Sequence, residues 1–435
     1  MNFHFEPQIK HAWPISISVL LLIFSSQPCL SQDTLKKIPD GSEGIFLTIH
    51  PTDSSINKLP PNEFEGSKAS FKIGVGFILD YTNYIQSDVF KEQMDIGEYT
   101  IEPKFKTRDF RILGSGRFKT KRSLAFKFAY MWDGDKETWL VRESGFTIGV
   151  PELAGHIFIG RTKEGFSLVK VMNGHSPPGY ERLMAIDLIP IMADGIKWFG
   201  YLPKSRVFWN LGYFNDVISK GQGFSTYAWQ AVARVGFLPV FDQKNNKVLH
   251  LGANFRYGEP LDGKITLKSK PESNITPPII NTGEFKTDYS THFGAEIYYS
   301  TGRILIGSES YMHKFYSDDG EDHTFMGGDI TFTYLFTGGP RPYNTTGSIF
   351  GFVPVKKSVF KGGLGEIEGV IKYSVFSLND GSIKGGKFWR ITPMVNWYLS
   401  KVMRMEFIYG YGVLDRYNLS GAVQFFESRI QFTIM

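Results

Sequence analysis

The sequence predicts an all-β protein, a transmembrane antiparallel β-barrel of about 16 strands. Two observations lead to this prediction: many segments of about ten residues alternate between apolar and polar side chains, and aromatic residues make up 15% of the chain. In the stretch 388–399, Trp389, Ile391 and Val395 fall on one face, and Arg390 and Thr392 fall on the other. Because successive side chains of a strand point to opposite faces of a sheet, this period of two indicates a strand. Charges on one face and large apolar groups on the other suit a wet barrel interior and a lipid-facing exterior.

A soluble β-sandwich shows the same alternation with its apolar face turned inward, so alternation alone does not separate the two folds. The chain has 435 residues, of which 42% are hydrophobic, and its mean hydropathy is -0.16. This value excludes a bundle of membrane helices but not a barrel, whose strands are only half apolar. The net charge of +5 is a weak signal that fits an anion path, a lipopolysaccharide-facing rim or neither.

The N-terminus favours the barrel because it looks like an export signal. Lys10 and His11 precede an apolar run, 15–24, of signal-peptide length and too short to span a bilayer. Small residues before Gln32 place the cleavage there, which removes Cys29, the one cysteine, and leaves no disulfide. A lipoprotein signal would use Cys29 itself, but Pro28 fits such a signal poorly. The expected organisation is a signal peptide at 1–31, a loosely ordered leader at 32–66 and the barrel at 67–435.

Alternating segments are expected to form the strands, separated by turn residues. Two interruptions stand out. The stretch 161–195 does not alternate, and 258–287 is a polar, proline-bearing loop that we expect at the surface. The expected strands are 70–81, 108–118, 124–132, 139–146, 155–160, 197–200, 205–214, 227–237, 248–257, 290–299, 303–313, 325–336, 366–376, 388–399, 402–411 and 422–435.

Several segments resemble the phosphate-selective porin O and P family over roughly 71–435. The middle of the family is similar to 160–168 (GRTKEGFSL), Glu181-Arg182 and 205–216 (SRVFWNLGYFND). The stretch 335–343 (LFTGGPRPY) resembles its Thr-Gly-x-x-Arg-Pro-Tyr turn, and 396–399 (NWYL) resembles one of its strands. The resemblance implies a 16-stranded barrel, usually a homotrimer, in the outer membrane of a Gram-negative bacterium. It also implies passive flux through a channel that an inward-folded loop narrows and that arginine and lysine line.

Two features depart from the family pattern. Outer-membrane barrels commonly end in an aromatic residue, whereas Phe432 lies three residues before the end of this chain. The phosphate-selective members also rely on dense basic ladders, and the polar faces of these strands carry mixed charges.

The polar face of each strand is expected to line the lumen. That rule assigns the following cations to the lumen: Arg111, Lys127, Arg142, Arg206, Arg234, Arg256, Lys372, Arg390, Arg404 and Arg429. It also assigns the carboxylates Asp109, Asp329, Glu368, Glu406 and Glu427 to the lumen. Basic groups in a low-dielectric wall concentrate anions. The alternative is that neighbouring lumenal charges pair across strands and stiffen the wall.

The interruption at 161–195 is the candidate constriction, because a long loop of a barrel either covers a mouth or folds in and sets the bore. Its candidate constriction cations are Arg161, Lys163, Lys170 and Arg182. The alternative is an external loop with solvated charges, and Glu164 and Glu181 weaken a pure anion filter.

Other chemistry finds little support. The oxygen-rich stretch 317–323 lacks calcium-loop spacing and is expected to be a solvated loop. Neither His-Glu-x-x-His nor Gly-x-Ser-x-Gly occurs, so no enzyme, cofactor or metal site is predicted. A Ser/His pair on neighbouring strands, involving His292, is the remaining catalytic alternative.

The expected function is therefore an outer-membrane porin, a water-filled channel for passive diffusion of small solutes. An anion or phosphate preference would come from the basic constriction. The expected partners are small anionic solutes such as phosphate, outer-membrane lipid and two further copies in a homotrimer, with no nucleic acid. The alternatives are a non-selective general porin with structural lumenal charges and a plugged, non-conducting barrel that acts as a surface binding protein.

Overall fold

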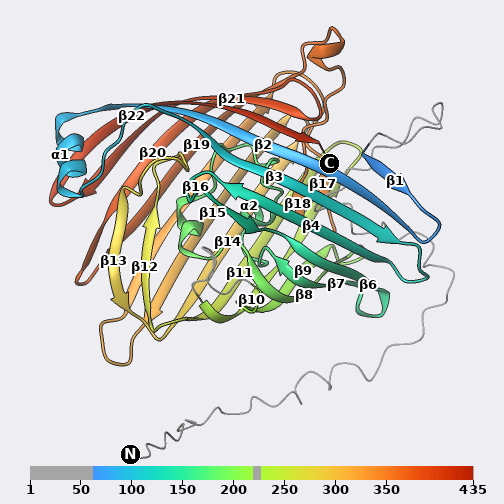
Figure 1. The fold of residues 1–435 in the computed structure, drawn as a ribbon, viewed down its shortest axis with the longest axis horizontal. Coiled ribbons are helices and arrows are strands. Elements are labelled where there is room, and N and C mark those ends of the chain that lie inside the picture. The colour runs from blue at the N-terminus through green and yellow to red at the C-terminus, as the bar shows by residue number, and fades with distance from the viewer. Residues whose placement is uncertain (1–61, 219–226, 435) are drawn as a thin grey trace, which may run out of the picture. The chain divides into compact units, whose positions relative to one another are not determined.

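A computed structural model of the protein describes residues 62–218 and 227–434. Within these residues, 16 antiparallel strands close into a barrel, which confirms the predicted fold class (Figure 1). β5 and β6 both pair with β4 and share one position in the wall. The wall strands, in order, are β2 (Ala69–Gln86), β3 (Lys104–Phe118), β4 (Leu124–Asp133), β5 (Thr138–Val141) with β6 (Ser144–Val150), β7 (Gly155–Thr162), β8 (Ala193–Leu202), β9 (Val207–Asn215), β10 (Tyr227–Asp242), β11 (Lys247–Pro260), β14 (Tyr289–Thr301), β15 (Ile304–Tyr316), β16 (His323–Leu335), β19 (Glu366–Asp380), β20 (Ile383–Tyr398), β21 (Met403–Arg416) and β22 (Leu419–Ile434).

The barrel closes where β22 pairs with β2, with Asp80 opposite Arg429 and Phe77 opposite Phe432. Within 62–218 and 227–434, closure leaves no wall strand with an unpaired edge, which a lipid environment requires. The short strand β1 (Glu63–Glu65) pairs with the first residues of β2 and lies within the predicted leader. The predicted signal peptide and the leader up to residue 61 lie outside the described residues.

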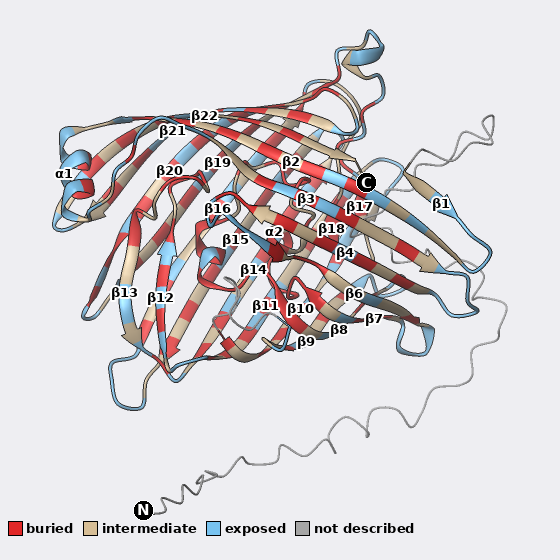
Figure 2. Ribbon diagram, viewed as in Figure 1, coloured by how far each residue is buried: buried red, intermediate tan, exposed pale blue. Residues whose placement is uncertain are grey.

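The strands carry their apolar side chains outward. On β20, Arg390, Thr392 and Asn396 are buried, whereas Ile391 is 41% and Val395 is 44% exposed. Figure 2 shows this alternation as red bands of buried residues along the strands. A soluble β-sandwich would bury the apolar face instead, so the inverted pattern is that of a wall facing lipid. No helix of the described residues is long and apolar enough to cross a membrane.

One end of the barrel carries a helix, which was not anticipated from the sequence. α1 (Asp88–Ile96) begins after Ser87, whose hydroxyl accepts a hydrogen bond from the Phe90 amide at 3.2 Å, as an N-cap residue does. The Gln93 side chain donates to the carbonyl oxygens of Leu414 and Leu419, each at 2.8 Å. These bonds hold the helix over the turn between β21 and β22.

Three long connections fold into the barrel, of which 336–365 does so only in part, since its Phe360 is 71% exposed. The predicted interruption is the loop 163–192, which contains α2 (Leu168–Val171) and the 3-10 helix η5 (Met184–Leu188) and buries Phe166 and Leu183. It starts at the α1 end of the barrel. The connection 336–365 starts at the opposite end, where the other connections are short turns, and contains β17 (Tyr343–Asn344), β18 (Ile349–Phe350) and the 3-10 helix η6 (Val359–Lys361).

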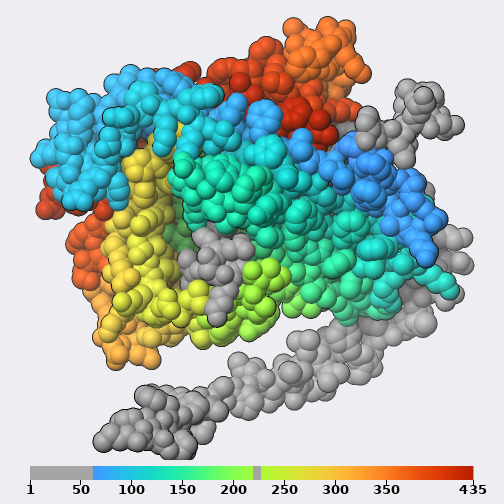
Figure 3. Space-filling model, in the orientation of Figure 1, coloured from blue at the N-terminus to red at the C-terminus, as the bar shows by residue number. Residues whose placement is uncertain are grey.

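The third inward segment corrects a prediction. The loop 261–288, expected at the surface, holds the hairpin of β12 (Lys264–Ser269) and β13 (Ile280–Lys286) and buries Glu272 and Ile279. Its yellow atoms lie against the light-blue and cyan atoms around α1 (Figure 3), where the Asn281 amide donates to the Tyr99 hydroxyl at 3.1 Å. Its polar sequence suggested a solvated loop, but a barrel lumen is itself polar and accepts such a segment.

Candidate functional site in the barrel lumen

Cations and amides of β19–β22 hold the loop 163–192 by its backbone. Arg404 donates to the Pro177 carbonyl at 3.1 Å, and Arg429 donates to the Tyr180 carbonyl at 2.6 Å. Lys372 donates to the Glu181 carbonyl at 3.1 Å. An irregular backbone inside a barrel has no neighbouring strand to pair with, so side chains must satisfy its carbonyls. Lys372, Arg404 and Arg429 therefore bind the backbone of the loop.

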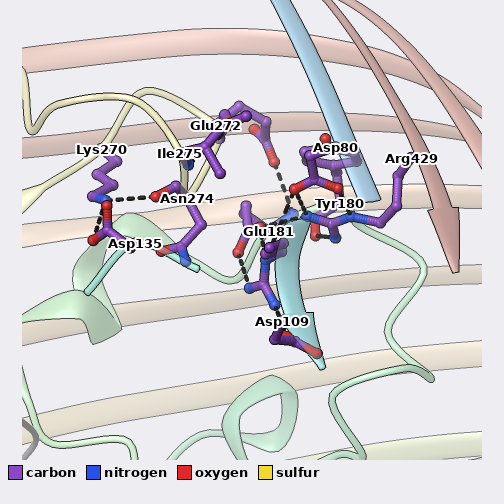
Figure 4. A network of polar contacts seen from close by, with 12 residues as sticks. Asp80, Asp109, Asp135, Tyr180, Glu181, Lys270, Glu272, Asn274, Ile275 and Arg429 are labelled. Carbon is purple, nitrogen blue, oxygen red and sulfur yellow. Dashed lines mark hydrogen bonds and ion pairs between the residues drawn. The ribbon is translucent and has the colours of Figure 1, made fainter. Parts of the chain in front are cut away.

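The same loop supplies a carboxylate partner to these cations (Figure 4). Arg429 forms a two-pronged ion pair with Asp80 at 2.7 and 2.8 Å and contacts Glu181 at 2.7 Å. Arg108 binds the other side of Glu181 through two hydrogen bonds of 2.9 Å. Burial alone would raise the pKa of Glu181, but the Arg108 and Arg429 guanidiniums lower it to about 2. Glu181 is thus an ionised link between the loop, β3 and β22.

The loop 261–288 contributes a second such carboxylate. Glu272 forms ion pairs of 2.7 Å with both Lys372 and Arg390, and all three side chains are buried. Nearby, Lys270 pairs with Asp135 at 2.9 Å and donates to the Asn274 carbonyl at 2.6 Å (Figure 4). Two predicted lumenal cations are therefore neutralised by a residue of an inward loop.

Charges on the opposite side of the lumen are also paired. Arg234 binds Glu296 at 2.8 Å, and His250 contacts the same carboxylate at 2.9 Å. Arg256 and Lys170 both contact Glu164 of the loop, at 3.2 and 2.7 Å.

Two of the four predicted constriction cations are held in buried ion pairs. Lys170 is fully buried against Glu164, and Arg161 is fully buried against Asp194 at 2.9 Å. Burial lowers the pKa of Lys170 to about 8, against the opposing effect of Glu164. Neither Arg161 nor Lys170 lines the lumenal cavity of about 300 Å³ that Arg182 lines.

The connection 336–365 meets the loop 163–192 through a residue whose role the sequence did not reveal. Arg341 binds Glu368 at 2.7 Å and the Tyr398 hydroxyl at 2.6 Å, and donates to the Ser176 carbonyl at 2.8 Å. Tyr343, two residues on, shares a hydrogen bond of 2.8 Å with His250. The Arg-Pro-Tyr motif was the available signal, and its arginine joins segments that enter from opposite ends.

A cavity of about 300 Å³ remains beside β3, β4 and β5. Arg108, Arg111, Arg142 and Arg182 line it. In the part of the chain that the structure describes, Nε and one terminal nitrogen of Arg182 have no hydrogen-bond partner. Burial and the neighbouring Arg108 lower the pKa of Arg182 to about 10, so it stays charged at neutral pH. Lys163 lies with Arg111 and Arg142 at an adjoining cavity of about 30 Å³.

The remaining predicted residues are placed as follows. Lys127 is buried and pairs with Glu143, and the carboxylates of Asp109, Asp329, Glu368, Glu406 and Glu427 are buried inside the barrel. Arg206 differs from the prediction: it is exposed in the turn before β9, with a positive φ of 55°, and donates to the Pro239 carbonyl at 3.3 Å.

In the part of the chain that the structure describes, the contacts of His292, the catalytic alternative, include a serine and a second histidine but no carboxylate. Its Nε2 lies 2.9 Å from the Ser290 hydroxyl and its Nδ1 lies 2.7 Å from Nδ1 of His313. All three side chains are fully buried. A Ser/His dyad needs an orienting group and access for a substrate, and this arrangement supplies a second imidazole instead. Among the described residues, no group of three or more His, Cys, Asp or Glu could hold a metal ion.

The model of the phosphate-selective porin O and P family matches residues 81–434. The chain belongs to this porin family. This confirms the resemblance, and family and fold together are those of an outer-membrane channel for solute diffusion. An uncharacterized protein of Caulobacter vibrioides is 26% identical over 171 residues, which are 38% of this chain and 34% of that protein, so the chain matches about a third of its length.

Two solved structures share the porin fold. The anion-selective porin from Comamonas acidovorans is 12% identical, with a TM-score of 0.51 over 84% of this chain and 100% of that chain. The in-vitro folded OmpT of Vibrio cholerae, an outer membrane protein in its trimer form, is 13% identical, with a TM-score of 0.51 over 84% of this chain and 99% of that chain. At these identities the likeness concerns the fold alone.

Proposed function

We propose that this porin is a narrow channel that prefers small anions, phosphate among them, to cations, and that its path runs through the cavity beside β3, β4 and β5. The observation that carries the proposal is the set of four arginines on that cavity. Positive groups in a low-dielectric wall raise the local concentration of anions.

The same lining carries five carboxylates beside its five cations, so the support comes from how these carboxylates are held and not from the net charge of the lining. Asp109 and Glu181 contact arginines, Asp135 contacts Lys270, Asp133 accepts the Asp135 amide at 2.9 Å, and Asp187 accepts the Ser269 hydroxyl at 2.6 Å. Arg182, by contrast, has two buried nitrogens that lack a hydrogen-bond partner among the described residues.

The proposed constriction accordingly consists of Arg111, Arg142, Lys163 and Arg182. Arg161 and Lys170, which the sequence also suggested, take a structural role in this proposal because each is fully buried in an ion pair.

A second candidate function is a plugged barrel that binds ligands at the surface and does not conduct. Its support is the set of three inward segments, whose apolar side chains pack together in the lumen. Tyr343 and Phe350 of the connection 336–365, for example, pack with Leu168 and Met172 of the loop 163–192.

The test is the reversal potential of the refolded protein in a planar bilayer across a KCl gradient, repeated with phosphate added. An anion-selective potential that Arg142→Gln with Arg182→Gln brings toward zero supports the proposal. Arg206→Gln, an exposed arginine in a turn, is the matched control and should leave the potential unchanged. Open conductance without selectivity indicates a general porin, and no conductance indicates the plugged barrel.

Assembly and export form two further parts of the proposal. A homotrimer is supported by the trimer form of the Vibrio cholerae neighbour, and native mass spectrometry of the detergent-extracted protein tests it against a monomer. A signal peptide at 1–31, followed by a leader at 32–66, predicts that the exported protein from a Gram-negative host begins at Gln32, which N-terminal sequencing measures. An N-terminus at residue 1 would contradict the cleavage.

A further inference from the structure

The cavity beside β3, β4 and β5 has two chemically different walls. Arginines of β3, of the β5–β6 strand and of the loop 163–192 form one wall. The other wall is apolar and comes from η5, the residues after it, and β12. Its side chains include Ile186, Leu188, Ile189, Ile191, Ile265 and Leu267.

An apolar wall is a poor surface for a fully hydrated inorganic anion. Phosphate carries oxygen on every side, and each oxygen that faces an apolar surface loses hydration without gaining a hydrogen bond. A ligand with an apolar body gains free energy by covering such a wall. A cavity of about 300 Å³ is at the lower end of the size range of small-molecule sites.

The arginine wall offers a fitting group for one end of such a ligand. Nε and one terminal nitrogen of Arg182 lack a hydrogen-bond partner among the described residues. Adjacent guanidinium nitrogens of this kind bind a carboxylate through two parallel hydrogen bonds. Most of the apolar side chains are packed into the core, but Ile191 keeps part of its surface open.

We propose that this cavity is a binding subsite for small organic carboxylates with an apolar body, such as aromatic monocarboxylates, in preference to inorganic phosphate. The carboxylate meets Arg182 and its neighbours on the charged wall, and the ring lies against the wall that contains Ile191 and Leu267. The inference rests on the proposed function, since it names the class of anion that the proposed path favours.

The experiment measures binding to the full-length, refolded protein in detergent by isothermal titration calorimetry with four probes: benzoate, benzamide, acetate and inorganic phosphate. Benzoate is expected to bind about tenfold or more tightly than acetate, which lacks the ring, and than benzamide, which lacks the charge. Phosphate is expected to bind more weakly than benzoate.

Two variants separate the walls. Ile191→Ser should weaken benzoate severalfold and leave acetate unchanged, whereas Arg182→Gln should weaken both. Ile96→Ser, at the exposed end of α1, is the matched control and should change neither.

The outcomes also separate this inference from the proposed function. Benzoate that binds no more tightly than acetate or phosphate, in a protein whose KCl reversal potential is anion-selective, overturns the organic subsite and leaves the anion channel standing. Benzoate binding that depends on Ile191 in a channel without anion selectivity supports the subsite and overturns the channel preference. Equal effects of Ile191→Ser and Ile96→Ser also contradict the subsite.

Discussion

The wall of β19–β22 and the wall of β3–β6 both present arginine side chains to the lumen, but these arginines differ in what they contact. On β21 and β22, Arg404 and Arg429 donate to carbonyls of the loop 163–192. On the other wall, Arg111 and Arg142 lie on a cavity of about 300 Å³. The loop contacts both walls, through Arg404 and Arg429 on the first and through Arg108 on the second, and the cavity lies beside the second.

This difference shows that a basic side chain in the lumen does not necessarily face the path of a solute. A buried carbonyl that loses water and finds no donor costs about 1–3 kcal/mol. Arg404 and Arg429 satisfy the inward backbone, whereas Arg111, Arg142 and Arg182 line the cavity.

The largest expected effect is on stability at the wall that holds the loop. Arg429→Gln should lower the free energy of unfolding by about 3–5 kcal/mol, because buried Asp80 loses its two-pronged ion pair and keeps only the 4.0 Å contact with Arg108. Denaturant unfolding of the barrel in lipid vesicles measures this change. Arg303→Gln, an exposed arginine that donates to the Phe336 carbonyl at 3.1 Å, is the control, and an equal loss in both variants would contradict the role of Arg429.

A smaller stability effect is expected for a predicted constriction cation. Lys170→Met should lower the free energy of unfolding by about 1–3 kcal/mol because Glu164 loses a hydrogen-bonded partner, while Arg256 still contacts it. The KCl reversal potential should not change. A loss of anion selectivity without a loss of stability would contradict the structural role of Lys170 and indicate that it belongs to the constriction. Lys357→Met, at an exposed lysine, is the matched control.

The smallest expected effect is a pH dependence of selectivity. Burial raises the pKa of Asp187, on the cavity lining, to about 6. Asp187 is therefore negative at pH 7.5 and neutral at pH 5, so acidification removes one negative charge and should increase anion preference up to about twofold. Burial and Arg111 lower the pKa of His175, which stays neutral over this window. Reversal potentials at both pH values measure the change, and Asp187→Asn should abolish it; a decrease in anion preference at pH 5 would contradict it.

The fold could be predicted because the period of two is a local property of each segment. The expected strand 366–376, for example, is β19 (Glu366–Asp380). Arg206 was wrongly assigned to the lumen because the apolar–polar alternation of the sequence continues across the turn before β9. Its positive φ places it in that turn and not in the strand.

The site could be predicted only in part, since charge is visible in a sequence but its partner is not. Asp80 and Arg429 are far apart in the chain and meet only when the barrel closes. Glu181 and Glu272 neutralise wall cations only because their loops fold inward. Nor could the sequence show that Nε and one terminal nitrogen of Arg182 lack a hydrogen-bond partner among the described residues.

The most direct test compares the reversal potentials of Arg182→Gln and Arg404→Gln across a KCl gradient, with heat-modifiability on gels as the check of folding. One unit charge about 5 Å from the path contributes about 0.8 kcal/mol at the dielectric constant of water, or about fourfold in relative permeability. The account predicts that Arg182→Gln lowers the ratio of anion to cation permeability about fourfold and that Arg404→Gln leaves it unchanged. Equal loss of selectivity in the two variants would contradict the distinction between cations that hold the loop and cations that line the cavity.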